Sequence, residues 1–362
     1  MKLRHFVLAL GALVVSPVTA HAEGPTYHVD PDWRPKIPEY WALGSVSSVA
    51  VDDRDHVWIL QRPSSLSPDE LALVQNPSTA KCCRPAPPVI ETDREGNVLR
   101  AWGGPGEGYD WPTSEHGIFV DHEGNVWIAG AGPIGTDGPN DGMVLKFTGD
   151  GKFIKQLGGR GSPANSLDRT MFGKPTAFDE DPEAREIYVA DGYVNHRVVV
   201  LDADTLEVKR LWGAYGKPPT DLKLENYDTD SPQFNTVHCV SRAPDGLIYV
   251  CDRVNNRIQV FHSDGTYVRQ FVFEPATRGA GSVWGAAVSP RDPGYVVMVD
   301  GGNKQMSVWR RSDGTVLHTF GRQGRYAGQF HWVHALAINS HGDVFTAEVD
   351  DGKRVQKWVR EP

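Results

Sequence analysis

The segment from Val237 to Phe261, VHCVSRAPDGLIYVCDRVNNRIQVF, decides the fold. It contains three apolar stretches with aromatic and β-branched residues, separated by the turn APDG and by the polar loop RVNN. Alternating apolar and polar residues bounded by Gly, Pro, Asn and Asp are typical of antiparallel β-strands. The segment therefore predicts three consecutive strands of a β-meander.

The same pattern recurs along the chain. Copies of its second strand lie at residues 56–59, 125–128, 186–189, 247–250, 295–298 and 343–346, roughly 48 to 69 residues apart. Most copies also have a third strand, and a fourth that ends in a glycine-rich turn. Such a unit cannot bury both of its faces alone, so the copies must stack, and six of them closing in a ring make a β-propeller. We expect an all-β fold, a single six-bladed β-propeller of four-stranded blades over residues 23–362.

The ring needs a closing strand. The chain stops after the third strand of the last copy, near Trp358. The region from Tyr27 to Pro38 is therefore expected to supply the outer strand of blade six and to close the ring. An open solenoid is the alternative, although the copies lack evident caps.

The N-terminus predicts export. Residues 1–22 combine a basic start, a short apolar core broken by Pro17 and an AHA cleavage site, which is typical of a signal peptide cut after Ala22. We expect a periplasmic or secreted protein that leaves the membrane after cleavage and is a monomer. A formal net charge of -9 and the lack of a basic stripe argue against nucleic acid as a partner.

Four cysteines are too few for a disulfide scaffold. Folding the chain about the APDG turn sets Cys239 and Cys251 opposite each other on adjacent strands, so a cross-strand disulfide can form there. Cys82 and Cys83 are neighbours in a Pro-rich loop, and the sequence does not fix their state.

Three histidines share one position in the repeat. His116, His238 and His334 each lie eleven residues before the second-strand aromatic of their blade. The equivalent positions in the other blades fall near Ser47, at Thr176 or Ala177, and at Gly285 or Ala286, all small or neutral.

This position opens on the central channel, since the first strand of each blade lines the axis. The histidines belong to blades two, four and six, so they should face one another across that axis. Three imidazoles with a free fourth position make a catalytic zinc site, although imidazole also suits copper, iron and nickel. We predict a metal held by His116, His238 and His334, with zinc as the first choice. His331 is a rival of His334, but only His334 keeps the eleven-residue spacing.

Three further groups lie where second strands return to the same mouth. They are Arg62, Tyr193 and Arg253. Position alone would equally suit three surface loops.

A family resemblance adds to this reading. DRVNNRIQVF, from Asp252 to Phe261, looks like an NHL repeat. The whole mature chain resembles bacterial proteins of the peptidyl-α-hydroxyglycine α-amidating lyase family. The runs that carry this resemblance are TSEHGI (113–118), VADGYVNHR (189–197), VHCV (237–240) with CDR (251–253), and HWVHALA (331–337).

The resemblance implies a metal-dependent carbon–nitrogen lyase. Tyr193 matches the catalytic tyrosine, while Arg62 and Arg253 match arginines that bind the substrate carboxylate or stabilise charge. Such an enzyme cleaves a carbinolamide into a primary amide and glyoxylate, with no organic cofactor. The substrate would be a small molecule or derived from a peptide.

The sequence also departs from the family. In the animal lyases an aspartate follows the third zinc histidine and helps to hold a calcium ion, whereas Ala335 stands here, which argues against calcium. Val194 replaces the cysteine that follows the catalytic tyrosine. The insertion from about Ser64 to Pro88 has no assignable counterpart, and its place after a second strand allows it to cover the mouth.

Two other functions stay open. A metal-dependent propeller hydrolase or lactonase would use a metal-bound hydroxide, but such enzymes usually recruit carboxylate ligands. A non-catalytic NHL propeller that only binds partners is the second alternative. The fold by itself does not choose among them.

Overall fold

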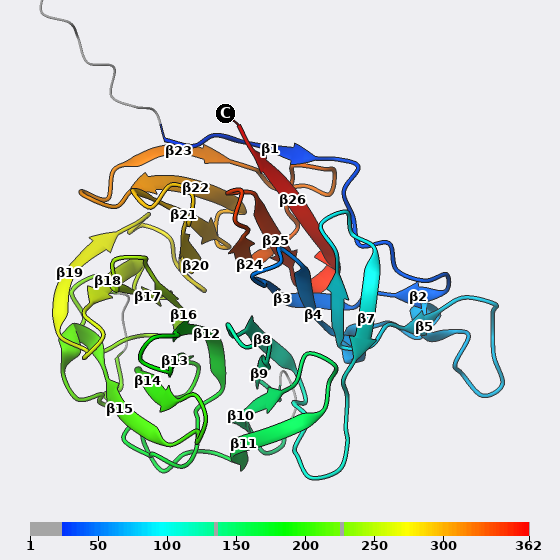
Figure 1. Cartoon of the computed structure of the whole chain (residues 1–362), viewed down its shortest axis with the longest axis horizontal. Helices are drawn as coiled ribbons and strands as arrows, with labels where there is room; N and C mark the ends of the chain where they lie inside the picture. Colours follow the sequence, from blue (N-terminus) through cyan, green and yellow to red (C-terminus); the bar gives the residue numbers. More distant parts are fainter. Residues whose placement is uncertain (1–23, 134–136, 225–227, 362) are drawn as a thin grey trace, which may run out of the picture.

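The computed structural model describes residues 24–133, 137–224 and 228–361. The predicted signal peptide, residues 1–22, lies outside these ranges. The described chain forms six four-stranded antiparallel sheets around a central axis, as the sequence predicted (Figure 1). Among the described residues, no helix has the length and apolar character needed to cross a bilayer.

Each blade is a meander whose first strand lines the axis. Blade one contains β3 (Ser45–Val51), β4 (Val57–Arg62), β6 (Val89–Thr92) and β7 (Val98–Trp102); blade two contains β8 (Glu115–Val120), β9 (Val126–Gly130), β10 (Asp141–Phe147) and β11 (Phe153–Arg160). Blade three contains β12 (Pro175–Asp181), β13 (Glu186–Asp191), β14 (Arg197–Asp202) and β15 (Val208–Trp212); blade four contains β16 (Val237–Arg242), β17 (Ile248–Asp252), β18 (Arg257–Phe261) and β19 (Tyr267–Val272). Blade five contains β20 (Val283–Val288), β21 (Tyr295–Asp300), β22 (Gln305–Arg310) and β23 (Val316–Phe320); blade six contains β24 (Val333–Ile338), β25 (Val344–Glu348), β26 (Arg354–Arg360) and β1 (Tyr27–Asp30).

The ring closes through the N-terminal strand, as predicted. Strand β1 pairs antiparallel with β26, with Tyr27 opposite Arg360 (Figure 1). The chain then runs on to blade one, where the Lys36 N–H donates to the Gly96 carbonyl over 2.7 Å. First strands of neighbouring blades contact one another all the way round, including β24 against β3. The N-terminal segment therefore ties the last blade to the first.

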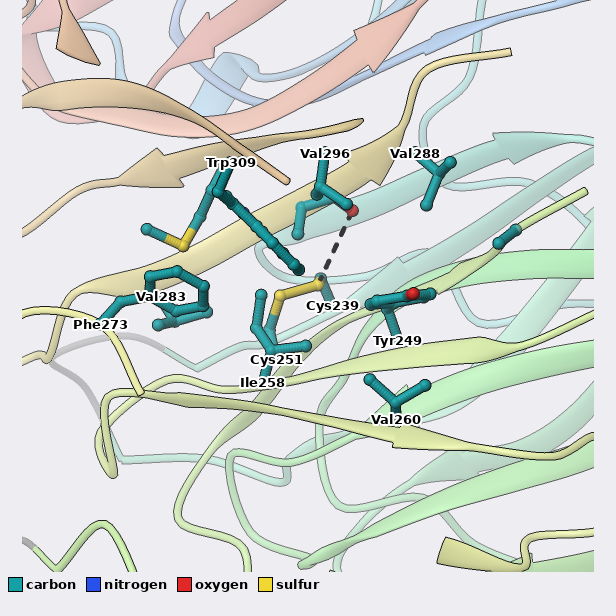
Figure 2. Close-up of a cluster of buried hydrophobic side chains, with 13 residues drawn as sticks. Cys239, Tyr249, Cys251, Ile258, Val260, Phe273, Val283, Val288, Val296 and Trp309 are labelled. Atoms are coloured by element: carbon teal, nitrogen blue, oxygen red, sulfur yellow. Dashed lines mark hydrogen bonds between the residues drawn. A yellow bond between two sulfur atoms is a disulfide. The ribbon is translucent and has the colours of Figure 1, made fainter. Parts of the chain in front are cut away.

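The hydrophobic core is divided into six clusters, one at each interface between blades. Second-strand aromatics fill these interfaces; Trp58 and Trp127, for example, are almost fully buried against the following blade. Figure 2 shows the interface of blades four and five, where Tyr249 meets Trp309. Alternation along each strand thus buries both faces of every sheet, which explains why single blades cannot stand alone.

Both pairs of cysteines are joined. Cys239 lies opposite Cys251 in the ladder, and a disulfide connects them within the cluster of Figure 2. The predicted cross-strand bridge is therefore confirmed. Cys82 and Cys83 are also disulfide-bonded, a pairing that the sequence left open.

Buried ion pairs tie loops to blades. The Arg257 guanidinium lies 2.7 Å from the Asp252 carboxylate, and both side chains are fully buried. The same guanidinium donates to the carbonyls of Thr229 and Ser231 in the connection between blades three and four. Asp191 and Arg197 make the equivalent pair in blade three. These buried pairs brace the loops between strands.

Removing one partner of such a pair is expected to be costly. Asp252→Ala leaves the Arg257 charge buried without a counter-ion, so we expect the free energy of unfolding to fall by about 3–5 kcal/mol. Urea denaturation would measure this loss. Asp313→Ala removes half of an exposed pair with Arg310 and should change the free energy of unfolding far less. Equal effects of the two changes would contradict this account.

Candidate active site

A β-bulge occurs at the same place in the first strand of every blade. The residue that each bulge leaves out of the ladder is Ser47, His116, Thr176, His238, Trp284 or His334, in blade order. Bulges re-aim side chains and are common beside active sites. The sequence places histidines at every second one of these six equivalent positions.

The structure brings the three histidines together on the axis. Their ring centroids are 4.8 Å apart for His116 and His334, 4.9 Å for His238 and His334, and 5.1 Å for His116 and His238. All three side chains are buried, with at most 4% of each residue exposed. Alternate blades thus supply one cluster, as the repeat spacing predicts.

Each histidine is oriented by the backbone of the next odd-numbered blade. The Nδ1 atom of His116 lies 3.0 Å from the Thr176 carbonyl oxygen, and that of His238 lies 2.5 Å from the Trp284 carbonyl oxygen. His334 Nδ1 is 2.6 Å from the Ser47 carbonyl oxygen, so the three bulges without histidine provide all three acceptors. A carbonyl can only accept, which places the proton on Nδ1 and leaves Nε2 with its lone pair free.

Burial keeps these imidazoles neutral. It lowers the pKa of His116 and of His238 well below the usual value and the pKa of His334 to about 3, and the nearby cations Arg62 and Arg253 act in the same direction. Neutral imidazole is the form that binds a metal. The site therefore carries its ligands in the required protonation state over the physiological pH range.

These residues fit a metal ion. One ligand atom from each histidine lies within 4.8 Å of the others, close enough for one ion to gather them. Three neutral nitrogens with an open fourth position suit zinc, and the donor set is also acceptable to other transition metals. A second group, Asp52, His56 and Glu91, is already neutralised by Arg54 and Arg100 and does not resemble such a site.

Among the described residues, the other histidines lie outside the cluster. His331 is half-buried, and its backbone N–H donates to Glu348. His122, His262 and His341 are exposed. Three others are partly buried, because their turns or strands pack against neighbouring groups: His56, His196 and His318.

Tyr193 connects the histidines to an arginine. Its hydroxyl lies 3.1 Å from His116 Nε2 and 3.2 Å from His238 Nε2, on the lone-pair side of both rings. Arg253 Nη1 donates to the same hydroxyl over 3.1 Å. The Tyr193 hydroxyl is therefore placed to take or give a proton at the open face of the histidine cluster.

Two arginines beside the cluster lack a counter-ion. Arg62 donates from Nε to the Glu115 carbonyl oxygen over 2.7 Å, and burial lowers the pKa of its guanidinium. Arg253 is only 8% exposed, and its Nε has no partner. Within the described residues, no carboxylate lies at ion-pair distance from either side chain. Because buried charges are normally paired, this arrangement favours an anionic ligand.

Glu115, an acidic residue near Arg62, does not fill this role. Glu115 is buried, and its carboxyl accepts a hydrogen bond from the Trp111 indole over 2.8 Å. Burial raises the pKa of Glu115. The guanidinium groups therefore stay available to a carboxylate from outside.

Two cavities meet the site. An axial cavity of about 310 Å³ extends from the histidines along the first strands. A second cavity of about 630 Å³ at the mouth is lined by Arg62, by hydroxyl groups such as Ser114 and by Asp350. Of the insertion at 64–88, Ser64 and Ser65 line this mouth cavity. Its strand β5 (Arg84–Pro85) pairs with β2 (Trp41–Ala42), and this two-stranded sheet lies outside the ring (Figure 1). The insertion therefore borders the mouth without covering it.

One residue of this environment was missed. Gly285 or Ala286 was the expected blade-five counterpart of the histidines, but the bulge places Trp284 there. The error arose because the first hairpin of blade five has a longer turn. Counting back eleven residues from Val297, the partner of Ala287, therefore lands too late. The signal that could have revealed it is the aromatic one position earlier.

Comparison with known proteins agrees with this architecture. Residues 234–261 match the NHL repeat. The chain is a six-bladed propeller that contains an NHL repeat. The solved streptogramin B lyase structure covers 92% of this propeller with a TM-score of 0.54 and 13% identity, and 98% of that structure is covered in turn. At this identity the likeness concerns the fold alone.

Two sequence relatives of this propeller carry different names. NHL repeat-containing protein 3 of Mus musculus is 30% identical over 70% of the chain, and a probable peptidyl-α-hydroxyglycine α-amidating lyase of Caenorhabditis elegans is 24% identical over 66%. The chain spans 63% of the mouse protein and 62% of the worm protein.

Proposed function

We propose that the protein is a metal-dependent carbon–nitrogen lyase acting on carbinolamides of the α-hydroxyglycine type. The observation that carries this proposal is the grouping of three neutral histidines, the Tyr193 hydroxyl, and two arginines without a carboxylate partner. An N-acyl-α-hydroxyglycine offers the complementary groups, because its hydroxyl and its carboxylate are both bonded to the α-carbon. The amidating lyase among the relatives supports the choice of reaction.

The chain's own residues account for binding and proton transfer. Arg253 and Arg62 would hold the substrate carboxylate, because a guanidinium can donate two parallel hydrogen bonds to it. Tyr193 would take the proton of the α-hydroxyl as the C–O bond becomes a carbonyl and the C–N bond breaks. The leaving nitrogen gains a proton, so the products are a primary amide and glyoxylate, with no change in oxidation state.

His116, His238 and His334 would hold the metal, with zinc as the expected ion. When bound, it supplies a Lewis acid beside the substrate hydroxyl. We further propose that the enzyme works in the periplasm or outside the cell as a monomer. Disulfides at Cys239–Cys251 and Cys82–Cys83 support an oxidising compartment.

The direct test is glyoxylate release from α-hydroxyhippurate by protein loaded with zinc. We expect benzamide and glyoxylate in equal amounts, and no release by the Arg253→Met variant above the uncatalysed background. A protein that holds one ion per chain but cleaves neither this compound nor small polar carbinolamides such as ureidoglycolate would refute the proposed reaction.

A further inference from the structure

Blade five breaks the pattern of the odd-numbered bulges. Ser47 and Thr176 place small side chains beside the histidines, whereas Trp284 places an indole there. Its ring centroid lies 5.4 Å from His238 and 5.5 Å from His334. Neither of the other two bulges without a histidine has an aromatic side chain. The contacts of the Trp284 indole are therefore specific to blade five.

The indole holds Arg253. The guanidinium carbon lies 4.4 Å from the centroid of the Trp284 ring and 5.2 Å from that of the Tyr193 ring. Arg253 therefore contacts two aromatic rings and donates a hydrogen bond to the Tyr193 hydroxyl. No carboxylate of the described residues lies at ion-pair distance from it. A carboxylate partner would orient the guanidinium but would also occupy its donors and cancel its charge. An aromatic face orients a guanidinium and leaves its N–H edge free.

Trp284 is itself fixed. Its Nε1 donates to the Gly281 carbonyl over 2.8 Å, and Trp332 packs against it with centroids 5.6 Å apart. On another side lies Gly301, where a β-carbon would come within 2.5 Å of the indole. Only 5% of Trp284 is exposed. The ring therefore has one available position, and that position sets the plane of Arg253.

We propose that Trp284 is a positioning residue that holds the Arg253 guanidinium correctly aimed for the substrate carboxylate. This inference rests on the proposed function for the identity of the anion. Trp284 does not touch the reacting atoms in this account, so its loss should weaken carboxylate binding more than it slows the chemical step. Its backbone carbonyl, which accepts from His238, remains in any variant, so metal content should be preserved.

The test compares Trp284→Leu with Trp284→Phe and the wild-type protein. Binding of hippurate, which has the carboxylate but lacks the α-hydroxyl, would be followed by calorimetry on metal-loaded and on metal-free protein. We expect the leucine variant to bind hippurate about tenfold more weakly and the phenylalanine variant, which keeps a ring face, to recover most of the affinity. In turnover assays KM should rise by a similar factor while kcat changes much less. Trp309→Leu, which removes a buried tryptophan elsewhere in blade five, should leave hippurate binding unchanged.

Gly301→Ala provides a second approach if the leucine variant does not fold. The new methyl group would displace the indole while Trp284 and Arg253 both remain, so hippurate affinity should again fall. Unchanged hippurate affinity in a folded Trp284→Leu or Gly301→Ala protein would overturn the inference, as would a loss of affinity in Trp309→Leu of the same size. These outcomes are separate from the proposed reaction, because hippurate binding is measured without turnover. Absence of glyoxylate release from an enzyme that binds hippurate would refute the reaction and leave the role of Trp284 standing.

Discussion

The His238→Ala protein should lose its metal while remaining folded. In the proposed site each histidine would supply one of three protein ligands. We therefore expect the metal affinity to fall by more than about 100-fold, which exceeds the usual effect of removing a residue that only hydrogen-bonds to a ligand. His116→Ala and His334→Ala should behave alike, because the three side chains occupy equivalent bulges. Metal content by mass spectrometry, on protein dialysed against excess zinc, measures the effect.

His331→Ala is the matched control. It removes an imidazole three residues from His334 in the chain but outside the cluster, and it should retain about one ion per chain. Metal-free wild-type protein, even after zinc, copper, iron and nickel have been offered, would remove the basis for both the lyase and a metal-dependent hydrolase. The binding propeller would then be the leading explanation of the fold.

Tyr193→Phe should abolish most of the activity while the substrate still binds. The change deletes only the hydroxyl that contacts His116, His238 and Arg253. Since positioned acid–base groups contribute about 10²–10⁴-fold, we expect kcat for α-hydroxyhippurate to fall by that factor. KM should change little, because the carboxylate contacts of the arginines remain.

Tyr40→Phe, at an exposed tyrosine, is the control for loss of a phenolic hydroxyl and should be fully active. A Tyr193→Phe enzyme with kcat within about threefold of wild type would exclude Tyr193 as the general base. Metal analysis of the same variant separates a chemical defect from a defect in the histidine site. Retention of the ion with loss of turnover assigns the effect to proton transfer.

Most of the fold follows from the sequence because each blade repeats a short-range signal. Period-two alternation sets the strands, and polar turns set the hairpins, so the six copies are visible without any knowledge of distant contacts. Closure by Tyr27 and its neighbours was also predictable, since a three-stranded last copy leaves one ladder unpaired. Repetition converts a long-range arrangement into local patterns that can be counted.

The site was predictable where the count was regular. In blades two, four and six the first hairpin has the same length, so an eleven-residue spacing locates His116, His238 and His334 correctly. In blade five the longer turn shifts the count and hides Trp284. Its contact with Arg253 joins two blades, and spacing within one blade carries no information about such a contact.

Of the two disulfides, only the one within a repeat could be predicted from the sequence. Cys239 and Cys251 face each other across one hairpin, so their pairing follows from strand register. Cys82 and Cys83 lie in an insertion without a repeat counterpart, and nothing periodic constrains them. The position of this insertion beside the mouth depends on tertiary contacts such as the Lys353–Glu70 ion pair, which local sequence patterns do not encode.

The hydrogen bond from His334 to the Ser47 carbonyl crosses the seam where the ring is closed. An ion held by the three histidines would therefore bind the closed ring and not an opened one, since opening separates blade six from blade one. By thermodynamic linkage, whatever binds only the closed form stabilises it in proportion to the logarithm of ligand concentration. The stability of the closed ring would then depend both on the metal concentration and on the strength of the β1–β26 pairing. Ion binding would then hold the ring closed, and a weakened N-terminal strand would lower the metal affinity.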